Sequence, residues 1–290
     1  MNRPDFIIIG AMKSATSTLR NQLMAQPGIF ATEPKEPNFF SDDEMFALGE
    51  VWYSGLYDSA GNLDTVGEAS THYTKLPRYP DTVKRAHAYA PDAKLIYVMR
   101  HPVDRLISHY IHNWSMGFVG RDVALETALQ EYDNFVAYSQ YSVQLKPWIE
   151  AFGKSNVLPV FFDRLVQHSE SELRRICSFI GYSGEPKWVG GHDFGNVSSQ
   201  RLRRFPLYSL FVESKSTRWA RALIPKRAKE LVKSRLRMAN RPELTGPTRA
   251  TLEHTFDQDL KVIGEWLGVE LTCENFKSVT SSQSLDWTVR

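Results

Sequence analysis

Continuous apolar runs alternate along the chain with stretches in which apolar residues recur at helical spacing. The runs are rich in β-branched and aromatic residues and begin the segments 6–9, 94–99 and 157–165, and a further short strand is predicted over 64–68. A run without alternation is typical of a parallel strand that is covered on both faces. Helical spacing predicts helices over 16–24, 103–114, 122–132, 137–153, 169–180 and 248–267.

The order of these elements indicates the fold class. Strands that alternate with helices predict an α/β protein with a doubly wound parallel sheet. Residues 29–43 contain two prolines and predict a short extended piece followed by a loop. The polar residues 278–290 predict a loosely ordered tail. We expect one domain over residues 1–290.

Composition supports a globular protein and adds an expectation about its compartment. The chain has 290 residues, of which 42% are hydrophobic and 23% charged, a balance typical of a soluble domain. No apolar run reaches the roughly 18 residues that a membrane span needs, and the N-terminus has no cleavable leader pattern. Cys177 and Cys273 lie far apart and outside any CxxC pair, which favours a reducing compartment. We therefore expect a cytoplasmic protein without stable membrane insertion.

Positive charge is concentrated in one segment. Residues 201–241 contain 13 Lys or Arg and only two acids, whereas the whole chain has a formal charge of +2. An amphipathic helix pair with basic outer faces explains this pattern. A lid that attracts an anionic substrate, or a site for a polyanion, explains it as well. Nucleic-acid binding is disfavoured because no recognised module accompanies the segment.

The first predicted strand leads into a helix through the stretch GAMKSATST, residues 10–18. A helix N-terminus points backbone N–H groups at an anion, and the helix dipole favours negative charge there. Lys13 adds a positive charge, and hydroxyl donors come from Ser14, Thr16, Ser17 and Thr18. The spacing differs from the nucleotide-hydrolase loop, in which Gly-Lys follows late. A capped helix with a solvated Lys13 is the alternative.

A second candidate for anion binding follows the apolar run 94–99. Arg100 stands at the carboxyl end of that predicted strand, where open α/β sheets collect ligands. Ser108 follows eight residues later, within the next predicted helix. A guanidinium and a hydroxyl together suit a phosphate ester. Alternatively, Arg100 pairs with Asp104 and Ser108 is an ordinary helix residue.

Together these motifs resemble a known enzyme family. GAMKSATSTL and VMRHPVDRLISHY are similar to the two signature elements of sulfotransferases that use 3′-phosphoadenosine 5′-phosphosulfate (PAPS). TEPKEPNFFSD and VGEASTHY resemble segments of the heparan-sulfate-type branch and its bacterial relatives. The resemblance covers residues 5 to about 182. It implies a P-loop-like three-layer sandwich, a central parallel sheet flanked by helices, and transfer of a sulfuryl group to a carbohydrate or small hydroxylated metabolite.

The resemblance also implies roles for individual residues. Lys13 would stabilise the leaving oxygen, while the 5′-phosphosulfate would be held by Ser14, Ala15, Thr16, Ser17 and Thr18. Arg100 and Ser108 would hold the 3′-phosphate. Glu68 would be the general base, with its pKa set by Lys35 and burial, and Lys35 would bridge acceptor and sulfonate. His72 is the second candidate for the base.

Less specific expectations complete this interpretation. Tyr182 would lie near the adenine or ribose, and Arg201 would close over the nucleotide. Ala15 stands where many relatives have glycine, which argues against a positive φ there. No HxH, HExxH or carboxylate cluster suggests a metal. A small-molecule kinase of P-loop type and a non-catalytic anion-binding module remain the alternatives.

Overall fold

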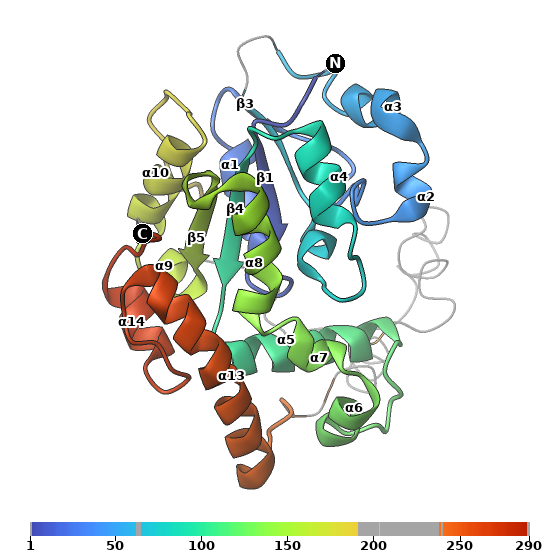
Figure 1. The fold of residues 1–290 in the computed structure, drawn as a ribbon, viewed down its shortest axis with the longest axis vertical. Helices are drawn as coiled ribbons and strands as arrows, with labels where there is room; N and C mark the ends of the chain where they lie inside the picture. The colour runs from blue at the N-terminus through green and yellow to red at the C-terminus, as the bar shows by residue number, and fades with distance from the viewer. Residues whose placement is uncertain (1, 62–64, 191–202, 204–237, 239, 289–290) are drawn as a thin grey trace, which may run out of the picture.

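The structure is a computed structural model that describes residues 2–61, 65–190, 203, 238 and 240–288. Nearly all of the basic segment 201–241, including Arg201, lies outside the described residues. The described part of the chain forms a central sheet with helices on both faces (Figure 1). The predicted three-layer α/β architecture is confirmed.

The described residues contain a five-stranded sheet in which every neighbouring pair is parallel. The strand order is β2-β3-β1-β4-β5. The strands are β1 (Phe6–Gly10), β2 (Ile29–Ala31), β3 (Thr65–Ala69), β4 (Lys94–Met99) and β5 (Val157–Phe161). The two strongest apolar runs in the sequence, β1 and β4, lie side by side in the middle of the sheet.

Alternate residues of each strand enter two separate hydrophobic cores. Ile7 and Ile9 of β1 belong to one core, and Phe6 and Ile8 belong to the other. The first core is closed by α4 (Thr82–Tyr89), α5 (Pro102–Met116), α8 (Tyr141–Phe152) and α13 (Gly246–Leu267). The second is closed by α1 (Thr16–Met24) and α10 (Ser169–Phe179). Both strand faces are therefore apolar, as the continuous runs predict.

Shorter elements complete the described chain. They are α2 (Asp43–Phe46), α3 (Gly49–Gly55), η1 (Thr71–Thr74), α6 (Leu125–Glu131), α7 (Asn134–Ala137), η2 (Lys154–Asn156), α9 (Phe162–Gln167) and α14 (Phe276–Ser282). The single helix expected over 137–153 begins only at 141. Within the described residues, no helix combines the length and apolar character that crossing a membrane requires.

Two sequence expectations near the ends of elements are wrong. The strand expected over 157–165 stops at Phe161, which pairs with Met99, the last residue of β4, and the chain turns directly into α9. Residues 278–288 of the tail expected over 278–290 instead complete α14 and pack against the body. Trp287 is buried, and its Nε1 donates to the carbonyl of Val157 at 2.6 Å. The apolar side chains within this polar segment explain the difference.

The parallel arrangement brings three connections to one edge of the sheet. The segments after β1, β3 and β4 all leave from carboxyl ends, where ligands bind in open α/β sheets. Gly10 permits a close approach at this edge, because a Cβ there would lie 2.1 Å from Thr74 Oγ1 and 2.8 Å from the Tyr97 ring. The candidate site lies along this edge.

Candidate active site

Residues 11–18, called the anion loop below, connect β1 to α1 as the sequence predicts. Within the described contacts no side chain caps the first turn of α1, and that turn holds no acidic residue. The Ser14 hydroxyl is buried and has no hydrogen-bond partner among the described atoms. Because buried polar groups are normally paired, an anion that accepts from this hydroxyl and from the helix N–H groups would complete the loop.

The backbone of the anion loop differs from the expectation for Ala15. Lys13 and Ala15 have φ of 73° and 67°, so both adopt the left-handed conformation. The sequence argument against a positive φ at Ala15 is wrong. A non-glycine residue there costs roughly 1–2 kcal/mol, and the short connection from β1 into α1 imposes the conformation nonetheless.

Arg100 reaches the anion loop from the neighbouring strand. Its Nη1 donates to the Lys13 carbonyl at 3.4 Å, and its guanidinium lies 4.6 Å from the ring centre of Phe162. Burial lowers the pKa of Arg100 below its ordinary value. Ser108 is buried in the second turn of α5, the helix that follows Arg100. The two residues expected to bind one phosphate thus lie on the same β4–α5 unit, Arg100 directly after the strand and Ser108 within the helix.

A second loop joins the anion loop from the side of β2. Residues 32–41, called the Lys-Glu loop below, follow β2 directly. Lys35 Nζ donates to Ser17 Oγ at 2.7 Å and pairs with Glu36 Oε1 at 3.1 Å. The other oxygen of Glu36 accepts from Thr71 Oγ1 at 3.2 Å, and the side chains of Lys35 and Glu36 are each 28% exposed. An ammonium and a carboxylate therefore lie together at the anion loop, within reach of solvent.

Glu68 occupies a very different environment at the end of β3. Its side chain is completely buried, and its carboxylate accepts from Tyr53 at 2.6 Å, Tyr73 at 2.7 Å and Ser70 at 2.7 Å. Burial raises its pKa from 4.5, and the three hydroxyl donors oppose that rise. The pKa of Glu68 is thus affected by these three hydroxyls and burial, whereas the sequence analysis expected Lys35 and burial to set it. A carboxylate enclosed in this way does not suit the base role expected for it.

The remaining predicted site residues are dispersed. His72 stacks on Tyr79, and burial is the largest cause that lowers its pKa to about 4. Tyr182 donates to the carbonyl of Pro27, beyond the C-terminal end of α1 and so at the opposite end of that helix from the anion loop. This placement removes Tyr182 from the proposed nucleotide site.

Two residues of the site were missed by sequence reasoning. Glu36 stands inside the quoted motif KEPNFF, between the predicted Lys35 and the buried Phe39, so a signal for it was present. Arg20 gave no such signal. It is buried in α1, and its Nη2 donates to the Thr32 carbonyl and to Glu33 Oε1, both at 2.7 Å. Arg20 therefore anchors the beginning of the Lys-Glu loop.

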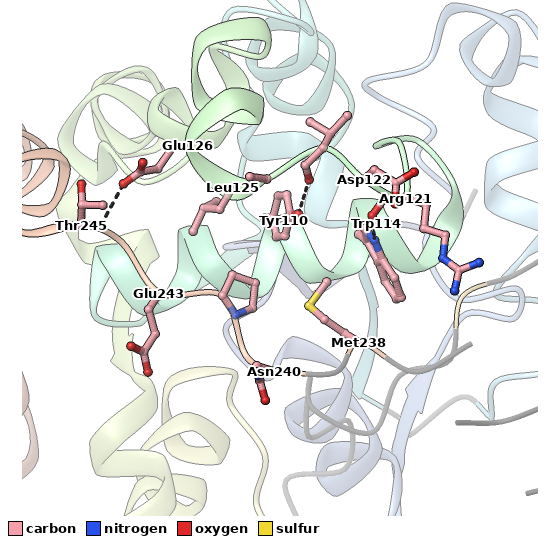
Figure 2. A pocket seen from close by; sticks show the side chains of 13 residues that line it. Tyr110, Trp114, Arg121, Asp122, Leu125, Glu126, Met238, Asn240, Glu243 and Thr245 are labelled. Carbon is pink, nitrogen blue, oxygen red and sulfur yellow. Dashed lines mark hydrogen bonds between the residues drawn. The ribbon is translucent and has the colours of Figure 1, made fainter. Parts of the chain in front are cut away.

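A separate pocket of about 520 Å³ lies beside the second half of α5 (Figure 2). Tyr110 and Trp114 form its wall, and their polar atoms donate to the carbonyls of Val123 and Arg121 at 2.6 and 3.1 Å. Carboxylates of Asp122, Glu126 and Glu243 also line it. None of its lining residues belongs to the anion loop or the Lys-Glu loop, so the pocket is not the site described above.

Comparison with known proteins identifies the family. Residues 3–234 match the sulfotransferase domain family over most of the chain. The chain belongs to the sulfotransferase family. Its enzymes transfer a sulfuryl group, which agrees with the anion loop at the end of β1. The resemblance noted in the sequence is confirmed.

Relatives within the sulfotransferase family include glycan-modifying enzymes. The chain is 32% identical over 184 residues to heparan sulfate glucosamine 3-O-sulfotransferase 6 of Mus musculus, covering 61% of this chain and 52% of that protein. It is 36% identical over 110 residues to the membrane-associated sulfotransferase kil1 of Dictyostelium discoideum, covering 37% and 22%. The chain thus spans about half the length or less of these curated relatives.

A solved sulfotransferase structure supports the fold. The sulfotransferase from Alicyclobacillus acidocaldarius superimposes with a TM-score of 0.66 at 23% identity, covering 93% of this chain and 98% of that one. At this identity the similarity shows the shared fold and leaves the acceptor open.

Proposed function

We propose that this protein is a PAPS-dependent sulfotransferase that sulfates a hydroxyl, or in second place an amine, of a carbohydrate or small hydroxylated metabolite. The observation that carries the proposal is the contact of Lys35 with both Ser17 and Glu36. It joins an anion-binding helix terminus to a partly exposed carboxylate. Sulfuryl transfer needs this combination of charge stabilisation and proton removal.

The donor side of the site uses the anion loop and Arg100. The N–H groups of α1, the Ser14 hydroxyl and the side chains of Thr16, Ser17 and Thr18 would hold the 5′-phosphosulfate, with Lys13 at the leaving oxygen. Arg100 and Ser108 would hold the 3′-phosphate. The bound donor supplies the sulfuryl group, and its phosphate oxygen departs when the sulfur–oxygen bond breaks. The unpartnered, buried Ser14 hydroxyl supports this fit.

We assign the general base to Glu36 rather than to Glu68. Glu36 would take the proton of the acceptor hydroxyl as its oxygen attacks the sulfur, while Lys35 would neutralise negative charge on the sulfonate. Solvent access and proximity to the anion loop support Glu36, whereas Glu68 is closed off by three hydroxyls. His72 is disfavoured because its ring stacks on Tyr79 and no hydrogen bond among the described residues joins it to the anion loop or the Lys-Glu loop.

The acceptor class rests on the relatives named above. The heparan sulfate enzymes act on a glucosamine unit by name, which supports a carbohydrate as first candidate. Transfer of labelled sulfate from PAPS to a panel of sugars and hydroxylated metabolites would identify the acceptor.

Donor binding is tested by thermal shift. Adenosine 3′,5′-bisphosphate (PAP), the donor product, should stabilise the protein and should stabilise the Lys13→Met variant less. Stabilisation by ATP with magnesium but not by PAP would contradict the proposal in favour of a kinase.

The base is tested by substitution of Glu36. Glu36→Gln should abolish transfer while PAP still stabilises the protein. Glu33→Gln is the matched control, because Glu33 lies three residues away with a side chain 69% exposed and should retain activity. Full transfer by Glu36→Gln would exclude Glu36 as the base.

A further inference from the structure

The carboxylate of Glu68 is the centre of a hydrogen-bond system that leads to the Lys-Glu loop. Ser70 Oγ donates to Glu68 Oε2 at 2.7 Å and accepts from the backbone N–H of Asn38 at 3.1 Å. The Tyr73 hydroxyl donates to Glu68 Oε1 at 2.7 Å and accepts from the N–H of Phe40 at 3.5 Å. Two amides of the loop are thus held by hydroxyls that the carboxylate orients.

A third connection reaches the residue between these two amides. The Tyr53 hydroxyl donates to Glu68 Oε1 at 2.6 Å. The Tyr53 ring stacks on Phe39 with centres 4.4 Å apart and planes inclined by 7°. Asn38, Phe39 and Phe40 are therefore each held by one of the three side chains that converge on Glu68.

The direction of these hydrogen bonds follows from the chemistry of the groups. A hydroxyl has a single proton, and an ionised carboxylate can only accept. Because Ser70 and Tyr73 donate their hydroxyl hydrogen bonds to Glu68, their lone pairs are left to accept from the loop amides. The buried carboxylate thereby determines that both hydroxyls are acceptors on the loop side.

The Lys-Glu loop requires such support because its backbone is strained. Glu36 and Asn38 have φ of 59° and 53°, the left-handed region that non-glycine residues occupy at a cost in free energy. Arg20 holds the beginning of the loop through the Thr32 carbonyl. The Glu68 system holds its end, so Lys35 and Glu36 lie between two anchors.

We propose that Glu68 is a positioning residue for sulfuryl transfer, which acts through Ser70, Tyr73 and Tyr53 to hold Lys35 and Glu36 against the anion loop. The proposal rests on the proposed function in that Lys35 and Glu36 are taken as the reacting groups. Glu68 itself contacts neither donor nor acceptor. Displacement of a catalytic group by 1 Å can reduce the rate on the order of a hundredfold.

The test compares variants that break different parts of the system. In Glu68→Gln one of the two positions carries N–H donors, so the amide cannot accept from all three hydroxyls. Ser70→Ala and Tyr73→Phe keep the carboxylate and each remove one amide contact. Tyr57→Phe is the matched control, because the Tyr57 hydroxyl donates to Tyr53 at 3.1 Å and makes no described hydrogen bond to the loop.

Two measurements are made on the full chain. Hydrogen–deuterium exchange of the peptide spanning 35–41 should be faster in Glu68→Gln, Ser70→Ala and Tyr73→Phe, and unchanged in Tyr57→Phe. The first three variants should have a lower kcat with stabilisation by PAP retained. The pH–rate profile of Glu68→Gln should keep its fall at low pH, whereas any residual activity of Glu36→Gln should lack it.

The outcomes separate this proposal from the proposed function. Unchanged exchange and kcat in both Ser70→Ala and Tyr73→Phe would overturn the positioning role, even if Glu68→Gln failed to fold. Loss of the low-pH fall in Glu68→Gln would instead make Glu68 the base. If Glu36→Gln stayed active while the three variants still accelerated exchange and lowered kcat, the assigned base would fail and the positioning role would stand.

Discussion

Replacement of Arg20 by methionine should loosen the beginning of the Lys-Glu loop and destabilise the fold by a measurable amount. The Arg20 side chain is 5% exposed, and its Nη2 lies 2.7 Å from both the Thr32 carbonyl and Glu33 Oε1. Methionine keeps most of the apolar stem but loses both hydrogen bonds. The buried Thr32 carbonyl would then lose this donor.

The size of the effect follows from the two contacts. A hydrogen bond from a charged group contributes about 1.5–3 kcal/mol, and the contact with Thr32 is of this kind. The pair with Glu33 contributes less than about 1 kcal/mol, because that carboxylate is 69% exposed. Removal of the buried, unpartnered Arg20 Nε works in the opposite direction. We therefore expect a net loss of about 2 kcal/mol.

Urea unfolding followed by tryptophan fluorescence measures this loss, provided that both proteins share one m-value. Glu33→Gln is the control and should change the free energy of unfolding by less than about 1 kcal/mol. The reasoning would be refuted if Arg20→Met lost less than about 0.5 kcal/mol, or if Glu33→Gln lost as much as Arg20→Met.

Two further predictions concern stability. Trp287→Ala should lower the free energy of unfolding by about 3–5 kcal/mol, because Trp287 is 9% exposed and bonded to Val157; a loss under about 1 kcal/mol in urea unfolding would mean that the chain end does not pack as described. Lys75 has its pKa lowered from 10.5 to about 8, chiefly by burial, so between these values the unfolded chain binds more protons and stability rises with pH. The free energy of unfolding of Lys75→Met, relative to that of the natural protein, should therefore fall by about 2.5 kcal/mol between pH 7 and pH 10, and a pH-independent difference in urea unfolding would contradict this.

Local pattern was sufficient for the sheet and for the positions of the anion loop and Arg100 at the carboxyl ends of their strands. Continuous apolar runs predicted β1 and β4, and helical spacing predicted α1 with its observed bounds of Thr16–Met24. Arg100 could be assigned because the carboxyl end of a strand is a property of the sequence once the strand is recognised. The same is true of the anion loop, whose donors are consecutive residues.

Our proposal of Glu36 as the base depends on the tertiary structure. Glu36 and Glu68 both stand in recognisable motifs, and nothing local tells which one is enclosed. Glu68 is closed off by Tyr53 and Tyr73, which reach it from different elements.

Other differences have the same origin. Tyr182 lies at the end of α1 opposite the anion loop because it contacts Pro27, which is distant from it in sequence. Trp287 packs against the body of the protein through an equally distant contact with Val157. A sequence determines which groups it contains and the periodicity of its elements. The burial and the hydrogen-bond partners of a side chain depend on segments that meet only when the chain folds. Our proposal of Glu36 as base and Glu68 as positioning residue rests on this difference in burial and partners.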